Sequence, residues 1–440
     1  MLNSFATRCR SRRLEVAGFL VVAALAAFVA PAARAQTIAG LPKGTDFGLD
    51  ARERPRQILK SEAEGGRQSY MVALGNAAFS SPTLFGEKAK EAGLSCDSCH
   101  RQGDINARFF IPGISAHRGG LDPTNGFFNP VQDDGVANHV DIPSLRGIRF
   151  LAPYGRDGRI GSLREFARHV IVNEFAGPEP EPRVLDALVA YMDQIDFLPN
   201  SKLNRLGRLA SSADPAAKRG EALFVKPFAG MDGKSCANCH VPESLFADGR
   251  RHDVGSNGLF KTPTLINAGL TAPYFHDGRY TSFLEVVEHF DRVFSLKLRP
   301  EETEDLVAYL DAVSAGEGSY EPVTRQAAMR EVSTYVSVLD HAIEANDLAA
   351  IGLVVETVNF DLNWIGWRFD TRAEFGGRLP ADVPDVRVVS AQLIGDMSAI
   401  LDLARAGNRV AAKTALANYH ARARTIVSNY PVGNLALPSR

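Results

Sequence analysis

The chain has 440 residues, which is enough for about three domains of ordinary size. Hydrophobic residues make up 45% of it and charged residues 23%, both ordinary values for a globular protein with more than one core. The formal net charge is only −2, which gives no sign of the basic surface that nucleic-acid binding requires, so we expect no nucleic-acid partner.

The first 35 residues carry the three-part pattern of a secretory signal. Arginines from Arg8 to Arg13 precede an apolar run from Val16 to Ala30, and Ala33-Arg34-Ala35 forms a small-x-small cleavage site. The alternative is a membrane anchor, but the apolar run of about 15 residues is shorter than the roughly 20 that span a bilayer. We therefore expect cleavage near Ala35, export to the periplasm, and no membrane-spanning segment in the rest of the chain.

Two C-x-x-C-H motifs contain every cysteine that remains after the signal. The first runs from Cys96 to His100 and the second from Cys236 to His240. This order is typical of covalent c-type haem attachment, because two thiols two residues apart reach the two vinyl groups of one porphyrin. The next residue then offers its imidazole to the iron, so His100 and His240 are the expected proximal ligands. The predicted residues of two haem c groups are Cys96, Cys99, His100, Cys236, Cys239 and His240.

Four cysteines in an exported chain could also form disulfides, bind zinc or carry out thioredoxin-like redox chemistry. A zinc site needs both cysteine pairs around one metal, and these pairs lie more than 130 residues apart. A redox pair has no need of the histidine that follows it. The repeated histidine therefore favours haem over the other three readings.

An internal repeat accounts for much of the chain. Residues 143–170 align with residues 263–290 at a constant offset of 120, and 11 of the 28 positions are identical. Both copies contain Ala-Pro-Tyr followed by Asp-Gly-Arg. Such self-similarity indicates two related structural units.

Each copy predicts the same order of elements. A first helix ends before the haem motif, a long loop and a short helix follow, and an amphipathic helix with apolar residues at helical spacing closes the unit. A haem clamped by a first and a last helix is the plan of small cytochromes c. The corresponding segments are 75–79 and 220–224 in the first helices, 162–171 and 282–291 in the short helices, and 188–193 and 306–311 in the closing helices.

The composition changes from about residue 320, where the repeat ends and no cysteine follows. Helical patterns cover residues 321–346, 348–364, 385–406 and 408–428. We therefore predict a mainly α fold, with two cytochrome c-like haem domains in tandem and a C-terminal helical bundle whose role the pattern does not indicate. The expected boundaries are 1–35 for the signal peptide, 36–200 and 201–319 for the N-terminal and C-terminal haem domains, and 320–440 for the bundle.

The two haem motifs and the repeat resemble the bacterial dihaem cytochrome c peroxidases and the related MauG enzymes. The most telling stretches are Lys261-Thr-Pro-Thr-Leu265 and Leu270-Thr-Ala-Pro-Tyr-Phe-His-Asp-Gly-Arg279, and the resemblance covers residues 60–315. It implies that the C-terminal haem relays electrons, that the N-terminal haem meets peroxide, and that Glu174 transfers protons beside the iron. The implied function is a periplasmic oxidoreductase that reduces hydrogen peroxide with electrons from a small cytochrome c or copper protein.

The resemblance also implies a calcium ion between the two haem domains. The matching ligands are Asp141, where the family often has Asn, and the backbone carbonyls of Thr271 and Pro273. A carboxylate is an acceptable hard oxygen ligand for calcium.

The distal haem ligands are where the sequence departs from the family. The ligand of the relay haem, a Met or Tyr elsewhere, falls at Phe290, which cannot bind iron. Either the adjacent His289 takes its place or that haem uses another group, with Met329 as a remote alternative. His169 is the counterpart of His289 in the first copy, and His117 lies in the loop where the peroxidases have a histidine that caps the N-terminal haem. The alternative for His169 and His289 is that they only pack.

A second departure concerns the tryptophan that the family commonly places just before the first Asp-Gly-Arg. Here that residue is Arg156, which suits a haem propionate better than electron transfer. Two other functions therefore stay open: MauG-like oxidation of a partner protein, and a non-enzymatic dihaem electron carrier or redox sensor with both irons capped by histidine. A homodimer is a further option.

Overall fold

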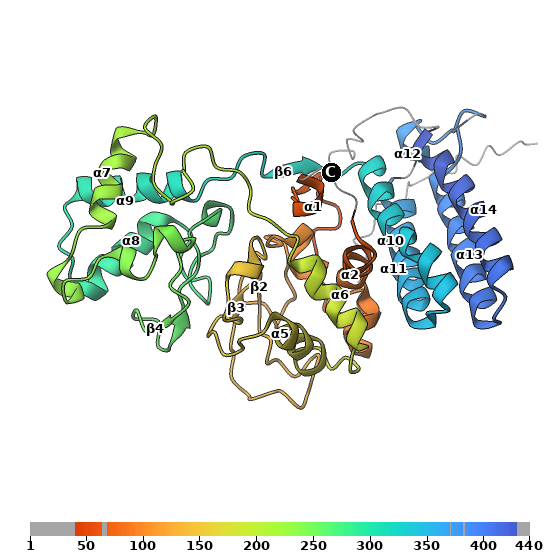
Figure 1. Cartoon of the computed structure of the whole chain (residues 1–440), viewed down its shortest axis with the longest axis horizontal. Helices are drawn as coiled ribbons and strands as arrows, with labels where there is room; N and C mark the ends of the chain where they lie inside the picture. The colour runs from red at the N-terminus through yellow and green to blue at the C-terminus, as the bar shows by residue number, and fades with distance from the viewer. Residues whose placement is uncertain (1–39, 64–67, 370, 382, 429–440) are drawn as a thin grey trace, which may run out of the picture. The chain divides into compact units, whose positions relative to one another are not determined.

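The computed structural model describes residues 40–63, 68–369, 371–381 and 383–428, and the predicted signal peptide at 1–35 lies outside them. The described chain is mainly helical, as the sequence predicts, and long loops separate the helices around both haem motifs (Figure 1). The short helical elements are α1 (Lys60–Ala63), η1 (Pro82–Leu84), α3 (Glu87–Glu91), α4 (Cys96–Cys99), η2 (Arg101–Gly103), η3 (Ile148–Phe150), η5 (Ala229–Met231), η6 (Cys236–Asn238), η7 (Pro242–Ser244) and η8 (Ala268–Leu270).

Helices α2 (Tyr70–Phe79) and α6 (Pro182–Met192) pack against each other in the first copy of the repeat. Pro182 stands at the first helical position of α6, where its missing N–H leaves no bond unmade. The helices cross at Gly75, where an added Cβ would lie 1.9 Å from the carbonyl oxygen of Ala187. Glycine is therefore required at this crossing, because it alone has no Cβ.

The second copy repeats this crossing. Helix α7 (Pro215–Phe224) packs on α9 (Pro300–Val313), and a Cβ added at Gly220 would lie 1.9 Å from the carbonyl oxygen of Asp305. Helix α8 (Phe283–Phe294) lies against α9 in the same group (Figure 1). Gly75 and Gly220 begin the corresponding segments 75–79 and 220–224, so they mark the same helix contact in both copies.

The short helix differs between the copies. In the first copy α5 (Leu163–His169) continues into η4 (Val170–Glu174), which is a π-helical turn, so the element is longer than expected. In the second copy α8 stays α-helical throughout. Ser162 and Ser282 cap the two helices by accepting from a backbone N–H three residues on. A π turn widens a helix locally and often occurs at functional sites.

The strands form three antiparallel pairs of two or three residues each. Two pairs lie at related places in the two copies, since the last residues of β3 and β5 are Asp141 and Lys261, which differ by the repeat offset of 120. The third pair joins the start of the described chain to the end of the second copy. The strands are β1 (Glu53–Pro55) with β6 (Tyr320–Pro322), β2 (Gly120–Leu121) with β3 (Val140–Asp141), and β4 (Arg251–His252) with β5 (Phe260–Lys261).

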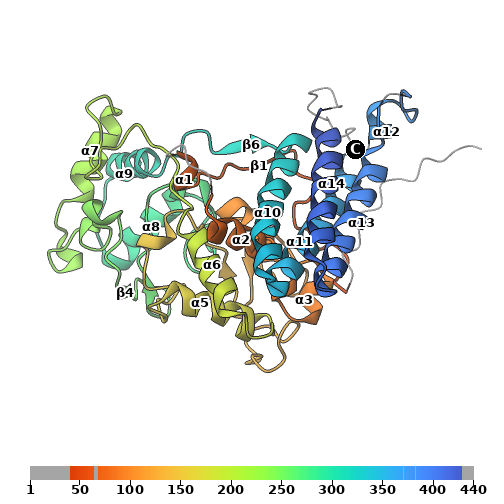
Figure 2. The same cartoon turned by 45° about the vertical axis from the view of Figure 1, so that its right-hand side comes forward.

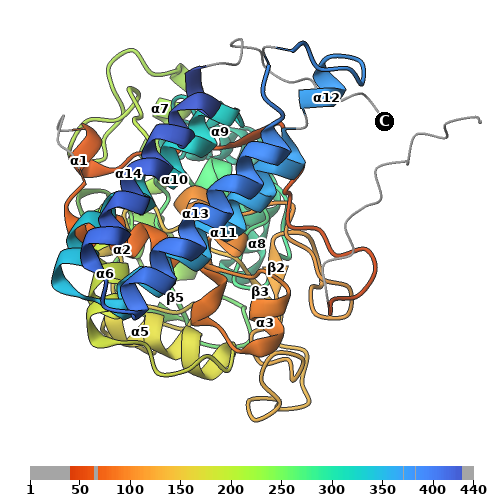
Figure 3. The ribbon, with the colours of Figure 1, turned by 90° about the vertical axis from the view of Figure 1, so that its right-hand side faces the viewer.

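Four long helices follow the repeat and lie side by side (Figures 2 and 3). Their ends agree with the predicted segments to within four residues. The short helix α12 (Thr371–Glu374) lies between α11 and α13, where the sequence pattern predicts no helix. The long helices are α10 (Arg325–Ala345), α11 (Leu348–Arg368), α13 (Val386–Arg405) and α14 (Arg409–Ser428).

These C-terminal helices share one hydrophobic core with the first copy of the repeat. Eight consecutive residues of α2, Val72 to Phe79, are buried, so this helix must be covered on all sides. Helix α6 covers one side, and α10 and α11 cover another. The Thr357 hydroxyl donates to the carbonyl of Ala77 (3.3 Å). The region that the sequence sets apart at residue 320 is therefore packed as part of this core, while the second copy has its own cluster.

Among the described helices, α11 alone is long and apolar enough to cross a membrane by length and composition. From the sequence we expect no such segment after the signal, and by length and composition α11 departs from that expectation. Half of its most apolar stretch is buried inside the protein, and Ile351, Val354 and Leu362 are inaccessible to solvent. These contacts are those of a core helix.

Candidate functional site

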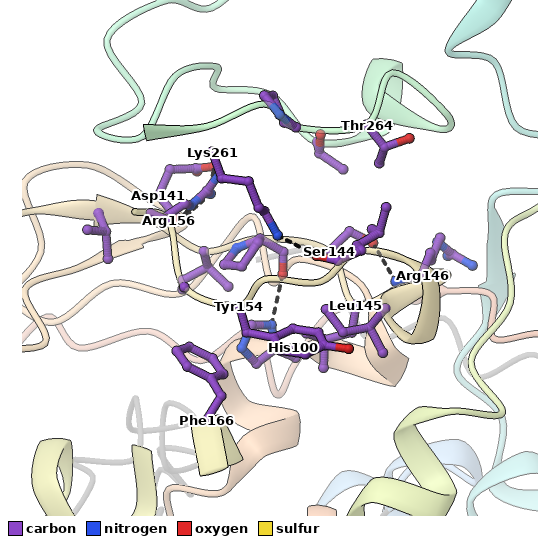
Figure 4. Close-up of a pocket in the computed structure, with 18 of the residues that line it drawn as sticks. His100, Asp141, Ser144, Leu145, Arg146, Tyr154, Arg156, Phe166, Lys261 and Thr264 are labelled. Carbon is purple, nitrogen blue, oxygen red and sulfur yellow. Dashed lines mark hydrogen bonds and ion pairs between the residues drawn. The ribbon is translucent and has the colours of Figure 1, made fainter. Parts of the chain in front are cut away.

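A cavity of about 770 Å³ lies at the first haem motif (Figure 4). This volume is within the roughly 300–1,000 Å³ that is usual for cofactor sites. The first copy supplies most of the wall, and the second copy supplies the rest, including Lys261 and Thr264 near β5 and Asn238 of the second haem motif. Apolar side chains dominate the wall, among them Phe85, Leu94, Leu121, Tyr154, Phe166 and Phe175.

His100 lines this cavity, and its orientation suits iron ligation. The ring Nδ1 lies 2.9 Å from the carbonyl oxygen of Pro143, which leaves Nε2 free. Burial lowers the pKa of His100 to about 4, so the imidazole is neutral, as a metal ligand must be. His240 repeats the pattern, with Nδ1 3.1 Å from the carbonyl oxygen of Phe246 and with its pKa lowered by burial. Both histidines fit the proximal role.

All four cysteines of the two motifs are free of disulfides in the described chain. We expect the double variant Cys96→Ala/Cys99→Ala to lose one covalent haem and Cys236→Ala/Cys239→Ala to lose the other, because each pair makes the thioethers of one porphyrin. Intact mass of the denatured protein measures this directly. Ser98→Ala, a change inside the first motif that keeps both thiols, should retain two haems. A two-haem mass in either double variant would refute the assignment.

Glu174 ends the π turn η4 and lines the same cavity. Its side chain is only 16% exposed, and burial raises the pKa of Glu174 to about 7, although Arg159 opposes the shift. Arg159 Nη2 lies 3.7 Å from the Glu174 carboxylate. A carboxyl group with a pKa near 7 can both take and give a proton at neutral pH.

His169 contacts Glu174 and Arg159. Its Nε2 lies 3.8 Å from Glu174 Oε1 and 3.3 Å from Arg159 Nη2, and its ring is partly exposed. Burial and the charge of Arg159 lower the pKa of His169. Glu174 and Arg159 both line the cavity. His169 therefore lies next to Glu174, the predicted acid–base group.

His289 is buried, and both of its ring nitrogens are engaged. Nδ1 lies 2.8 Å from the Tyr280 hydroxyl, and Nε2 lies 2.6 Å from the carbonyl oxygen of Val254. A ring that donates from Nε2 and accepts at Nδ1 has no lone pair left for iron. Phe290 packs between Phe275 and Phe294. Of the two sequence alternatives for His289, these contacts favour packing.

His117 lies against the second copy. Its Nε2 is 3.1 Å from the carbonyl oxygen of Asp277 and its Nδ1 is 2.8 Å from that of Arg118. A Cβ added at Gly278 would lie 2.3 Å from the His117 ring, so glycine is needed there for the contact. In this arrangement His117 joins the two copies, and its predicted role as a cap stays a prediction.

Of the predicted calcium ligands, Asp141 has its carboxylate paired with a guanidinium. Arg156 Nη2 lies 2.6 Å from Asp141 Oδ2, and Arg156 Nε lies 2.9 Å from the Asp141 carbonyl oxygen (Figure 4). Burial raises the pKa of Asp141 to about 6, and Arg156 opposes the shift. Thr271 lines the cavity, and its hydroxyl donates to the carbonyl of Ala268. The Pro273 ring lies near Gly278.

Two functional candidates were missed by the sequence analysis. Arg146 lines the cavity with a side chain only 1% exposed and pairs with Asp104, yet its Nη1 has no partner among the described residues. The free N–H of Arg146 could donate to an anion such as a haem propionate. Arg156 suits this role less well, because its guanidinium is already paired with Asp141. The other is Lys261, whose Nζ lies 2.7 Å from the carbonyl oxygens of Leu151 and Pro153. Burial and Arg156 lower the pKa of Lys261 to about 8.

Comparison with known proteins finds a family match in the second copy of the repeat. Residues 215–345 match the family model of the di-haem cytochrome c peroxidases. This segment begins with α7 and ends with α10, so it includes the second haem motif. A di-haem family implies haem c as the cofactor.

Three relatives are similar to this chain over longer stretches. Hydrazine synthase subunit gamma of Kuenenia stuttgartiensis is 24% identical over 284 residues, covering 51% of this chain and 73% of that protein. Methylamine utilization protein MauG of Methylorubrum extorquens is 26% identical, covering 56% and 78%. Cytochrome c551 peroxidase of Nitrosomonas europaea is 24% identical, covering 62% and 88%. The family resemblance drawn from the motifs and the repeat is thereby confirmed, but the family match continues past residue 315 to residue 345 and includes α10.

Proposed function

We propose that this relative of the di-haem cytochrome c peroxidases is an exported oxidoreductase that reduces hydrogen peroxide to water at the first haem motif. The observation that carries the proposal is Glu174, a buried carboxyl group in the wall of the cavity that His100 lines. A small cytochrome c or copper protein is the proposed electron donor, and the haem held by His240 is the proposed entry point for electrons.

Reduction of one peroxide consumes two electrons and two protons and yields two water molecules. A haem bound at His100 would supply the iron that accepts peroxide and passes electrons to it. Glu174 takes a proton from one peroxide oxygen and delivers it to the other, which becomes the leaving water. The positive charge of Arg159, 3.7 Å from the Glu174 carboxylate, favours its ionised form before each turnover.

The proposal extends to the arrangement of the chain. Residues 36–200 form the peroxide-binding haem domain and residues 201–319 the electron-relay haem domain, with cleavage near Ala35 placing both in the periplasm. MauG-like oxidation of a partner protein would use the same open site and stays the second candidate. The contacts of His289 argue against the carrier or sensor alternative, because that function needs a histidine free to cap the second iron.

We expect the turnover of peroxide by the holoprotein to rise as pH increases from about 6 to about 8. The sign follows from the raised pKa of Glu174, about 7, because the protonated acid that predominates below this pKa cannot act as the base. The steady-state rate with a reduced donor, measured against pH, tests this. Glu179→Gln, which removes an exposed carboxylate paired with Arg168, is the matched control and should keep the wild-type profile. A flat profile would contradict the proposal.

A further inference from the structure

The two copies of the repeat meet through equivalent backbone hydrogen bonds. The Asp141 N–H donates to the carbonyl of His276 (2.8 Å), and the Lys261 N–H donates to the carbonyl of Arg156 (2.9 Å). Asp141 corresponds to Lys261, and Arg156 to His276, at the repeat offset of 120. The contact is therefore two-fold symmetric in its backbone, although the side chains at the corresponding positions differ.

At one of the two equivalent places the chain provides an ammonium group. Lys261 Nζ lies 2.7 Å from the carbonyl oxygens of both Leu151 and Pro153. These two residues correspond, at the offset of 120, to Thr271 and Pro273. The family resemblance assigns the Thr271 and Pro273 carbonyls to calcium. The corresponding carbonyls in the first copy accept hydrogen bonds from Lys261 instead.

At the other place the chain provides a guanidinium group. Arg156 donates through Nε and Nη2 to the Asp141 carbonyl and through Nη2 to Asp141 Oδ2. The side chains are 24% and 5% exposed, so the pair is largely shielded from water. Two of the oxygens that Asp141 could offer a metal are already occupied by a positive group.

This arrangement does not fit a calcium ion. Calcium requires six to eight oxygen ligands, and a guanidinium at bonding distance from two of them repels a divalent cation. One atom favours a bound calcium ion, because Asp141 Oδ1 is buried and has no hydrogen-bond partner among the described residues. A single free oxygen is also satisfied by a water molecule.

We propose that the chain supplies its own cations at the contact between its two copies, with Arg156 in the place of calcium and Lys261 at the equivalent place. The arginine found where the family has tryptophan then has a structural reason. The contact would need no metal, and both cations would stay in place at any calcium concentration. This inference does not depend on the proposed function, because it concerns only how the two copies are held together.

Thermal unfolding of the holoprotein in excess EGTA and in millimolar calcium tests the proposal. The wild-type midpoint should be the same in both. Arg156→Gln should lower the midpoint in EGTA by about 5–10 °C, and calcium should restore part of the loss by binding the freed Asp141. Lys261→Met should also lower the midpoint, without rescue by calcium, because Lys261 Nζ contacts the carbonyl oxygens of Leu151 and Pro153 and its loss frees no carboxylate.

Arg164→Gln is the matched control, since it breaks an exposed ion pair with Asp186 in the same copy, and it should change neither midpoint. If Arg156→Gln does not fold, Arg156→Lys keeps the charge and should remain insensitive to calcium. A fall of the wild-type midpoint in EGTA, or calcium binding to the wild type in calorimetry, would overturn the proposal. An Arg156→Gln midpoint equal to that of the wild type would overturn it as well.

Discussion

Replacing Glu174 by Gln should lower kcat/KM for hydrogen peroxide by about 10²–10⁴-fold, the usual contribution of a positioned acid–base group. The amide has nearly the same shape as the carboxyl group but cannot take a proton. Because the substitution leaves His100 and both cysteines of the motif untouched, the visible absorption spectrum of the holoprotein should not change. The loss should be confined to turnover.

The measurement is steady-state peroxide reduction with a reduced donor, together with the spectrum of each variant. Glu179→Gln removes a carboxylate five residues away that is exposed and paired with Arg168, and it should leave kcat/KM near the wild-type value. Unaltered turnover in Glu174→Gln would remove Glu174 from the mechanism. A changed spectrum would mean that Glu174 acts on the haem environment instead.

Gly75→Ala and Gly220→Ala should each destabilise the protein by at least about 1–3 kcal/mol, the usual cost of overpacking a core. The added methyl group would lie 1.9 Å from a backbone carbonyl oxygen, of Ala187 in one case and of Asp305 in the other. Backbone atoms cannot move aside as a flexible side chain can, so the two helices must separate. The α2–α6 pair or the α7–α9 pair would open.

The thermal midpoint of the holoprotein, followed by circular dichroism, checks this expectation. Gly395→Ala is the matched control, because Gly395 lies within α13 with no atom within 4 Å of an added Cβ. Alanine there should stabilise the helix by about 0.5–1 kcal/mol. Midpoints for the Gly75 and Gly220 variants at or above that of the wild type would show that the crossing is looser than described.

Most helices of the fold could be predicted from local sequence patterns. The four C-terminal helices could be predicted because their apolar residues follow the helical period, and the repeat located α6 and α9 by their shared closing motif. The packing of the C-terminal helices on α2 could not be predicted in this way. It depends on contacts between residues almost 300 positions apart, such as Thr357 with Ala77. The signal that was available is the continuous apolar run of α2, which requires cover on every side.

The same distinction applies to the candidate site. The C-x-x-C-H motifs are local, so the sequence predicts the haem attachment residues directly. The partners of His289 and Arg156 are not local, and only the structure shows that Val254 and Asp141 hold them. Lys261 stands in a motif shared with the family, and its contacts are with two carbonyl groups more than 100 residues earlier.

Stopped-flow absorbance of the half-reduced holoprotein mixed with hydrogen peroxide tests the central claim most directly. In the proposed enzyme the cavity at His100 admits peroxide to an open iron, so the ferrous haem absorbance should disappear rapidly, at a rate that rises with peroxide concentration. The absence of any fast change would mean that both irons are capped, and the electron-carrier or sensor reading would then replace the peroxidase.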